Sequence, residues 1–386
     1  MKVKPAIFVL AVLVLASAAP AGKGRPPVFL TAPYLQNVKT DGITIMWETA
    51  DDEDCYVEYG LDSSYGNAEG CTSLVSGGDT IVYKSRLSGL SAGTTYHYRV
   101  VAGRRFSNDN TFTTAPSDEA DFSFGVWADS QGGDFEPTYS LIADMGQNVD
   151  IAVACGDVAA GENNNYLAVR LYFLDRVAAN LGPASVPYYV AWGNHDIQNG
   201  NAMDFVDHPA EEGNFSFNYS GCHFICIVDD DKRDYSWVEA DLQQAVAEDA
   251  RHIFVFVHRP PYCELWIDGE EDFRKRLVPL LEDYGVDACF SGHTHEYERG
   301  YLNGVYYCIT GGGSWLDITE ELVWYWEHIT VGGYDDLGPD VRAGLVNEYV
   351  RVDVDSSGWT ATMIPFYSDG SRRTDVTDSF SVSVMP

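Results

Sequence analysis

Five short apolar segments in the second part of the chain are predicted to be strands, and each leads into polar residues of types that bind metals. The segments are 122–128, 150–155, 186–192, 252–257 and 286–291. The sequences between them near 138–147, 164–180, 235–249 and 272–284 are predicted to be helical. Strands that alternate with helices usually lie parallel, so their carboxyl ends meet at one edge of a sheet. We therefore predict a layered α/β domain over residues 121–386 with a site at that edge.

The residues at these strand ends form a candidate set of metal ligands. In chain order they are Asp129 (with Ser130 and Gln131), Asp157, Asn194 (with His195 and Asp196), His258, and His293 with His295. Carboxylates, amide oxygens and imidazoles suit divalent ions, and the absence of cysteine from the set argues against structural zinc. The set is too large for one ion and suits two ions that share a carboxylate. Such a pair clamps a phosphate and generates a hydroxide nucleophile.

The first part of the chain is predicted to be all-β. In residues 27–116 apolar and polar residues alternate, as at Ile43, Ile45 and Trp47, which is typical of half-buried strands. A run of short strands separated by turns predicts a β-sandwich of the immunoglobulin or fibronectin type. Residues 314–346 are long, irregular and rich in aromatic residues, and we interpret them as an insertion that can border the site.

The N-terminal residues have the features of an export signal. Lys2 and Lys4 precede an apolar run over 6–16, and small residues follow, which predicts a signal peptide over 1–18, or up to residue 21. The run is too short to span a membrane, and no other membrane segment is predicted. We expect a protein that is secreted, periplasmic or on the cell surface.

Charge and cysteine content limit the partners. The formal net charge is −34, and such a chain repels nucleic acid, so a phosphate backbone is an unlikely partner unless metals intervene. The sequence leaves the oligomeric state open. Eight cysteines in an exported chain permit disulfides, and Cys55 and Cys71 could pair across neighbouring strands.

These motifs resemble those of the calcineurin-like metallophosphoesterases and, within them, the purple acid phosphatases. The matching blocks are Asp129-Ser130-Gln131, Gly156-Asp157, Gly193-Asn194-His195-Asp196, Val255-Phe256-Val257-His258 and Gly292-His293-Thr294-His295, with Glu296-Tyr297-Glu298-Arg299 as the continuation. Near the N-terminus, Pro33-Tyr34-Leu35-Gln36 and Ile45-Met46-Trp47 look like the fibronectin-like domain of that family. The resemblance implies an all-β sandwich followed by a four-layer α/β/β/α catalytic domain. It also implies a metal-dependent hydrolase of phosphoric esters, of the acid phosphatase type.

The resemblance further implies a role for each matching residue. Asp129 and His295 would bind one metal, Asn194, His258 and His293 would bind the other, and Asp157 would bridge both. His195 would protonate the leaving group or contact the phosphate, and Asp196 could hold its imidazole in the cationic, correctly turned state. The two ions would be divalent iron, manganese or zinc, and a metal-held hydroxide would attack phosphorus in line.

One position departs from the purple acid phosphatase pattern. That pattern has a tyrosine three residues after the bridging aspartate, and this chain has Ala160 there. Without a tyrosinate ligand we expect a colourless protein with two divalent ions. Gln131 lies where many relatives in the wider superfamily have a histidine ligand, and it either gives its amide oxygen to a metal or only forms hydrogen bonds.

The substrate is less constrained than the metal site. Arg259 and Tyr262 follow the ligand His258 and are expected to line the mouth of the site. The leading prediction is hydrolysis of phosphomonoesters, and a phosphodiesterase or nucleotide-cleaving enzyme of the same fold is the nearest alternative. A surface interaction protein with an inactive phosphatase-like domain is the alternative of another class.

Overall fold

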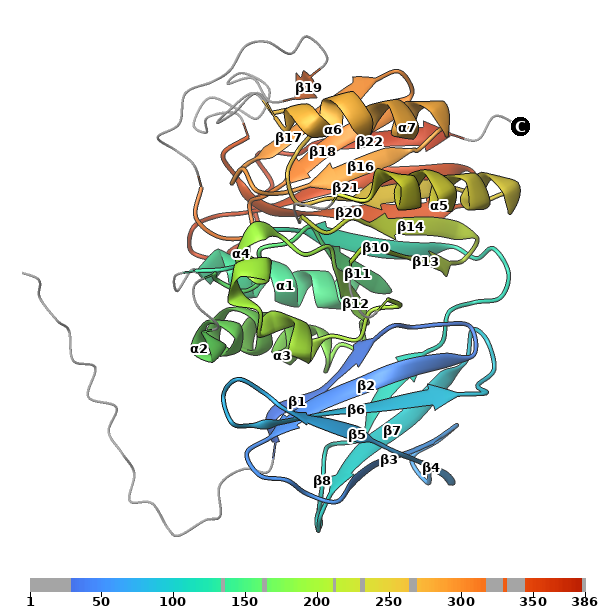
Figure 1. The fold of residues 1–386 in the computed structure, drawn as a ribbon, viewed down its shortest axis with the longest axis vertical. Helices are drawn as coiled ribbons and strands as arrows, with labels where there is room; N and C mark the ends of the chain where they lie inside the picture. Colours follow the sequence, from blue (N-terminus) through green and yellow to red (C-terminus); the bar gives the residue numbers. More distant parts are fainter. Residues whose placement is uncertain are drawn as a thin grey trace, which may run out of the picture.

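The computed structural model of the protein describes residues 29–132, 136–161, 165–210, 213–229, 233–263, 269–316, 329–331 and 344–383. The predicted signal peptide and most of the predicted insertion over 314–346 lie outside the described residues. Within these ranges we find no helix with the length and apolar character needed to cross a membrane. The chain forms a β-sandwich, at the bottom of Figure 1, and a layered α/β unit above it.

The sandwich consists of two antiparallel sheets, as the alternating pattern predicted. Their strand orders are β1-β2-β6-β5 and β4-β3-β7-β8, with β9 also paired to β7. The strands are β1 (Phe29–Gln36), β2 (Gly42–Thr49), β3 (Cys55–Gly60), β4 (Asn67–Gly70), β5 (Thr72–Val75), β6 (Ile81–Ser88), β7 (Thr95–Ala102), β8 (Arg105–Phe106) and β9 (Asn110–Thr113). Strands β4 and β5 were not predicted, because every residue in them is exposed and neither has an apolar face.

The α/β unit has two further sheets, with orders β12-β11-β10-β20-β21-β22 and β13-β14-β15-β16-β18-β17-β19. The first contains β10 (Phe122–Trp127), β11 (Ile151–Ala154), β12 (Tyr188–Val190), β20 (Asn347–Asp355), β21 (Gly358–Phe366) and β22 (Ser379–Ser383). The second contains β13 (Phe215–Tyr219), β14 (Cys222–Cys226), β15 (Ile253–Phe256), β16 (Ala288–Ser291), β17 (Tyr297–Leu302), β18 (Val305–Thr310) and β19 (Ile329–Val331). Strands β10, β11 and β12 are parallel, and so are β14, β15, β16 and β18.

Aromatic side chains fill the space between these two sheets. The ring of Phe124 in β10 contacts Phe224 of β14 and Phe254 of β15, with centroids 5.2 and 4.9 Å apart. Edge-to-face pairs of this kind add to the stabilisation that comes from burying the rings.

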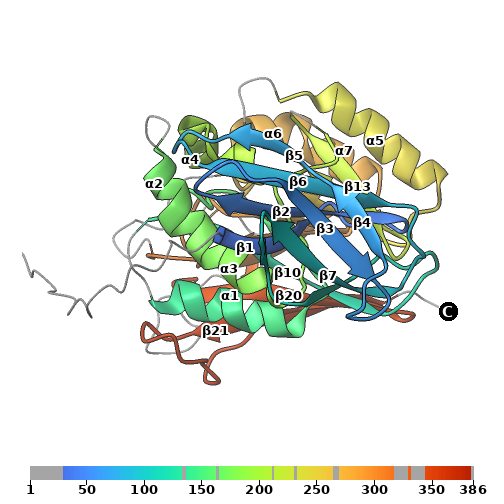
Figure 2. The same ribbon diagram turned by 90° about the horizontal axis from the view of Figure 1, so that it is seen from below.

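Helices cover the outer faces of both sheets, which gives the predicted four layers. The helices are α1 (Glu136–Asn148), α2 (Tyr166–Ala168), η1 (Val169–Ala178), α3 (Ala179–Leu181), α4 (Asn194–Asn199), η2 (Ala202–Phe205), α5 (Tyr235–Ala247), α6 (Glu271–Arg276) and α7 (Val278–Asp283). Leu141 of α1 and Phe173 of η1 pack on the first sheet, and Leu242 of α5 and Phe273 of α6 pack on the second. Figure 2 shows α1 and α3 on one side of the molecule and α5 and α6 on the opposite side.

Polar contacts join the sandwich to the α/β unit. Asp207, just after η2, accepts hydrogen bonds from Thr44 of β2 at 2.6 Å and from Lys84 of β6 at 2.7 Å. Arg86 of β6 donates to the same carboxylate through two nitrogens, at 3.1 and 2.6 Å. Because the Asp207 side chain is only 2% exposed, this cluster fixes the sandwich to the α/β unit at a buried point.

Candidate metal centre

The predicted ligands come from strand ends of both sheets in the α/β unit. In the first sheet, Asp129 and Asp157 lie in the loops after β10 and β11, and Asn194 begins α4 after β12. In the second sheet, His258 follows β15, and His293 and His295 follow β16. The prediction that all five strands share one sheet was therefore wrong. The strand ends meet all the same, since ligand atoms of Asp157, His258 and His293 lie within 4.8 Å of one another.

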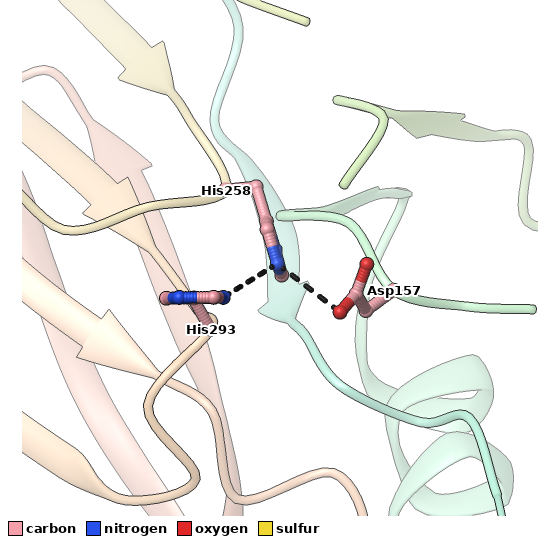
Figure 3. A group of neighbouring side chains, drawn as sticks. All are labelled: Asp157, His258 and His293. Atoms are coloured by element: carbon pink, nitrogen blue, oxygen red, sulfur yellow. Dashed lines mark hydrogen bonds and ion pairs between the residues drawn. The ribbon is translucent and has the colours of Figure 1, made fainter. Parts of the chain in front are cut away.

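His258 lies at the centre of one group of ligands, as Figure 3 shows for its two labelled neighbours. Its Nδ1 lies 2.8 Å from the carbonyl oxygen of Cys155 and donates to it, which leaves Nε2 as the lone-pair nitrogen. Nε2 faces Asn194 Oδ1 at 3.1 Å, Asp157 Oδ2 at 3.2 Å and His293 Nδ1 at 3.2 Å.

Asp129 and His295 form the other group. Asp129 is fully buried, and its Oδ2 accepts a hydrogen bond from the backbone N–H of His293 at 2.7 Å. Its Oδ1 lies 3.5 Å from His295 Nε2. The other ring nitrogen of His295 is held by the carbonyl oxygen of Trp315 at 3.0 Å, so Nε2 is directed toward Asp129.

Both groups fit metal ions because they bring together nitrogen and oxygen atoms of the types that bind divalent cations. An imidazole nitrogen, an amide oxygen and a carboxylate oxygen that face one another repel unless a cation lies between them. Burial opposes a charged ring at His258, but Asp157 and Asp129 outweigh it and raise the pKa of His258 to about 10, so the two carboxylates favour positive charge at this point. Burial and the nearby His258 lower the pKa of His293 to about 2, which keeps this ring neutral with one nitrogen able to bind a metal. The residues present therefore suit divalent ions.

The backbone is strained at three of these ligands. The φ angle is 56° at Asp129, 52° at Asp157 and 72° at His293. Residues other than glycine rarely adopt this conformation, and it recurs at active sites where the surrounding structure enforces it. The glycines of the motifs permit the close approach of the loops, because a Cβ on Gly193 would lie 2.3 Å from Asp157 Oδ1 and one on Gly292 would lie 2.4 Å from Asp129 Oδ2.

Asp196 has a different role from the predicted one. It lies in the first turn of α4, and its fully buried carboxylate accepts hydrogen bonds from the backbone N–H groups of Asp157 at 2.7 Å, Ala159 at 2.8 Å and Gly193 at 3.0 Å. Burial and the charge of Asp157 raise the pKa of Asp196 to about 7, against the opposing effect of these amides. The prediction that Asp196 holds the imidazole of His195 is therefore wrong, because its oxygens are committed to the backbone of the Asp157 loop.

His195 lies at the rim of the site. Its side chain is 43% exposed, and its Nε2 lies 3.9 Å from Asp157 Oδ2. Its backbone N–H donates to the other oxygen of Asp157 at 2.9 Å, which fixes the start of α4 against that ligand. A ring beside a ligand and open to solvent can exchange protons with a bound substrate.

Gln131 and Ala160 occupy the positions that depart from the family pattern. Gln131 is 2% exposed and its Nε2 donates to Asp157 Oδ2 at 3.4 Å, while no hydrogen bond reaches its Oε1 from the described residues. Gln131 was predicted either to give its amide oxygen to a metal or only to form hydrogen bonds. These two roles differ by a rotation of the amide group that exchanges its oxygen and nitrogen, so both stay predictions. The carbonyl oxygen of Ala160 accepts from Asn199 of α4 at 2.8 Å. Tyr166, the next tyrosine along the chain, donates instead to Glu48 of β2.

The predicted substrate residues do not contact the ligands described above. Arg259 Nε donates to Asp229 at 2.8 Å, and its substrate contact stays a prediction. The ring of Tyr262 packs edge-on against Tyr307 at 5.0 Å, in the apolar cluster under α5 to α7. The structure thus gives Tyr262 a packing role and no support for the substrate contact predicted for it.

Residues that hold the Asp129 loop were missed from the sequence. Ser314 Oγ donates to the Asp129 carbonyl oxygen at 2.6 Å, and Arg176 of η1 donates to the carbonyl oxygens of Ser130 at 2.8 Å and Gly132 at 2.9 Å. Both are side chain-to-backbone contacts across long sequence separations. The run Gly311-Gly312-Gly313 after β18 was a usable signal, because a Cβ on Gly313 would lie 2.0 Å from the Ala128 carbonyl oxygen.

The α/β/β/α layers and this ligand set define the metallophosphoesterase class. Comparison with known families agrees: residues 122–297 match the calcineurin-like phosphoesterases, and residues 31–114 match the N-terminal domain of purple acid phosphatases. The two parts of the chain are therefore similar to a calcineurin-like phosphoesterase domain and to a purple acid phosphatase N-terminal domain, as its motifs predicted.

Individual relatives are distant. The chain is 28% identical over 293 residues to purple acid phosphatase 22 of Arabidopsis thaliana, covering 67% of this chain and 64% of the relative. It is 26% identical over 240 residues to a nucleotide pyrophosphatase/phosphodiesterase of Hordeum vulgare, covering 49% of this chain and 63% of the relative. The chain thus spans less than two thirds of the length of either. The solved structure of PhoD shares the fold, with a TM-score of 0.64, 14% identity and coverage of 92% of this chain and 91% of PhoD.

Proposed function

We propose that the protein is a hydrolase of phosphate esters that uses two divalent ions of iron, manganese or zinc. The observation that carries the proposal is the meeting of Asp157, Asn194 and His293 around His258 Nε2, all at 3.1–3.2 Å. Asp129 and His295 form a second group, which is linked to the first because Asp129 accepts from the backbone N–H of His293. Asp157 is the residue that we propose bridges the two ions. Burying carboxylates and unprotonated nitrogens costs free energy, and apolar residues would pack this region better. The arrangement therefore points to a functional role.

The residues divide the chemistry between them. Two bound ions would supply a hydroxide nucleophile and offset the charge of the phosphate. The six ligand side chains would hold the ions, and the hydrogen bonds to Asp196 keep the strained Asp157 loop in place. His195, exposed at the rim, gives a proton to the leaving oxygen.

Phosphomonoesters are the substrate class we propose first, as small molecules that an exported enzyme meets outside the cell. The net charge of −34 supports a small substrate over a nucleic acid. The similarity to the Hordeum vulgare nucleotide pyrophosphatase/phosphodiesterase supports diester or pyrophosphate cleavage as the second candidate.

The test is metal analysis combined with two esters. Purified protein loaded with manganese, zinc or iron is expected to hold about two ions per chain and to hydrolyse p-nitrophenyl phosphate faster than bis-p-nitrophenyl phosphate. Asp157→Asn is expected to lose metal and activity together, whereas Asp353→Asn, an exposed aspartate paired with Arg351, serves as the matched control. The reverse order of rates would select the diesterase. Absence of bound metal and of turnover with either ester would leave the interaction protein as the remaining candidate.

A further inference from the structure

An exposed tryptophan lies beside the metal ligands. The ring of Trp315 packs against the ring of His295, with centroids 4.3 Å apart and planes inclined at 60°, yet the residue is 37% exposed. Its indole also lies over Gly132, three residues after Asp129, because a Cβ added there would come within 2.5 Å of Trp315 Cζ3. Trp315 therefore borders the half of the site formed by Asp129 and His295.

The backbone that carries this ring is held firmly. The Trp315 carbonyl oxygen accepts from His295 Nδ1 at 3.0 Å, and the preceding Ser314 donates to the Asp129 carbonyl oxygen at 2.6 Å. Asn347 Nδ2 donates to the carbonyl oxygens of Ser314 and, at 2.9 Å, Gly312. Ser314 is 1% exposed, so the chain that leads into Trp315 is buried. An aromatic ring on a backbone fixed by its neighbours loses little entropy when a ligand stacks on it.

We propose that Trp315 is an aromatic platform for the organic group of the substrate, and that the enzyme prefers phosphate esters of aromatic or heteroaromatic groups over those of aliphatic alcohols. This inference rests on the proposed phosphoesterase function. A phosphate held at the metal centre brings its ester group close to the ligands, and the indole of Trp315 is an exposed apolar surface on the His295 side. An indole face attracts flat π systems, and stacking is tolerant of which ring is stacked. Trp315 acts on binding and does not take part in bond cleavage.

A matched pair of substrates isolates the effect of the ring. Adenosine 5′-monophosphate and ribose 5-phosphate share the phosphate, the ester bond and the sugar, and they differ by the adenine. For the metal-loaded wild-type protein we expect kcat/KM to be about tenfold higher for the nucleotide, within the range found for base stacking on aromatic residues. Trp315→Leu is expected to remove this preference by raising KM for the nucleotide about tenfold with little change in kcat. Trp315→Phe should keep most of the preference, because it keeps an aromatic face.

The controls separate the inference from the function on which it rests. The carbonyl that holds His295 is a backbone group, so both variants are expected to keep the wild-type metal content. Phe106→Ala removes an aromatic residue that is 54% exposed in the sandwich and should leave the preference unchanged. Equal kcat/KM for the two esters in the wild type, or equal losses on both esters in Trp315→Leu, would overturn the platform. Absence of turnover of any phosphate ester by the metal-loaded wild type would overturn the proposed function instead.

Discussion

Replacement of Asp196 by asparagine tests the largest difference between the sequence prediction and the structure. The sequence assigned Asp196 to the imidazole of His195, whereas the structure commits its two oxygens to three backbone N–H groups, at 2.7, 2.8 and 3.0 Å. Asparagine has one acceptor oxygen in place of two, so at least one of these donors faces an NH₂ group and loses its partner.

The size of the effect follows from those contacts. A hydrogen bond to a charged group contributes about 1.5–3 kcal/mol, and a buried donor without a partner costs about 1–3 kcal/mol. Burial already penalises the charged form of Asp196, as its raised pKa of about 7 shows, which favours the lower part of this range. We expect Asp196→Asn to lower the free energy of unfolding by about 2 kcal/mol. Because Asp196 positions the Asp157 loop, metal affinity should fall about tenfold.

Urea unfolding of the metal-free protein and calorimetric titration with Mn²⁺ measure these two quantities. Asp353→Asn is the matched control, since its carboxylate is 47% exposed and its pair with Arg351 should contribute less than about 1 kcal/mol. If Asp196→Asn behaved like this control in both measurements but shifted the pH dependence of kcat, the carboxylate would act on His195 and our account of it would be refuted.

Four further predictions concern the chemistry, the cysteines and the junction between the two units. His195→Ala is expected to lower kcat about 10²- to 10⁴-fold without loss of bound metal, and full activity would remove it from the reaction. With Ala160 in place of the tyrosine, the metal-loaded protein should show no visible charge-transfer band, which an absorption spectrum checks. The register of β3 and β4 places Cys55 opposite Cys71, whose Sγ lies 3.0 Å from the Cys55 carbonyl oxygen, so oxidised protein should gain the mass of two hydrogens on reduction. Asp207→Asn should cost about 2 kcal/mol at neutral pH in urea unfolding. Burial works to raise the pKa of Asp207, but the two cations of β6 hold it below its usual value, so its stabilisation is present above about pH 4 and is lost as the pH falls through the folded-state pKa. The difference between wild type and Asp207→Asn should therefore shrink below about pH 4, and a constant difference down to pH 2 would contradict this account.

Much of the fold could be predicted because its signals are local. The predicted strands over 122–128, 150–155 and 252–257 contain β10, β11 and β15, since their apolar runs directly reflect burial. Local signals also have limits. The predicted strand over 186–192 is longer than the observed strand, since β12 covers only Tyr188–Val190. The predicted helix over 272–284 is divided into α6 and α7 next to Pro279, which lacks an N–H for the helical ladder.

The sequence alone determined which residues lie at the strand ends, because the ligand residues, several of them next to a glycine, come directly after apolar strands along the chain. It thereby established the metallophosphoesterase resemblance and the sandwich that precedes it. Tertiary structure decided how those ends meet: the strands divide between two facing sheets, Asp196 turns to the Asp157 backbone, and Trp315 reaches His295 from a loop 20 residues further along the chain. These contacts depend on the packing of distant segments, and the side chains that make them have no pattern in the sequence of either segment taken alone.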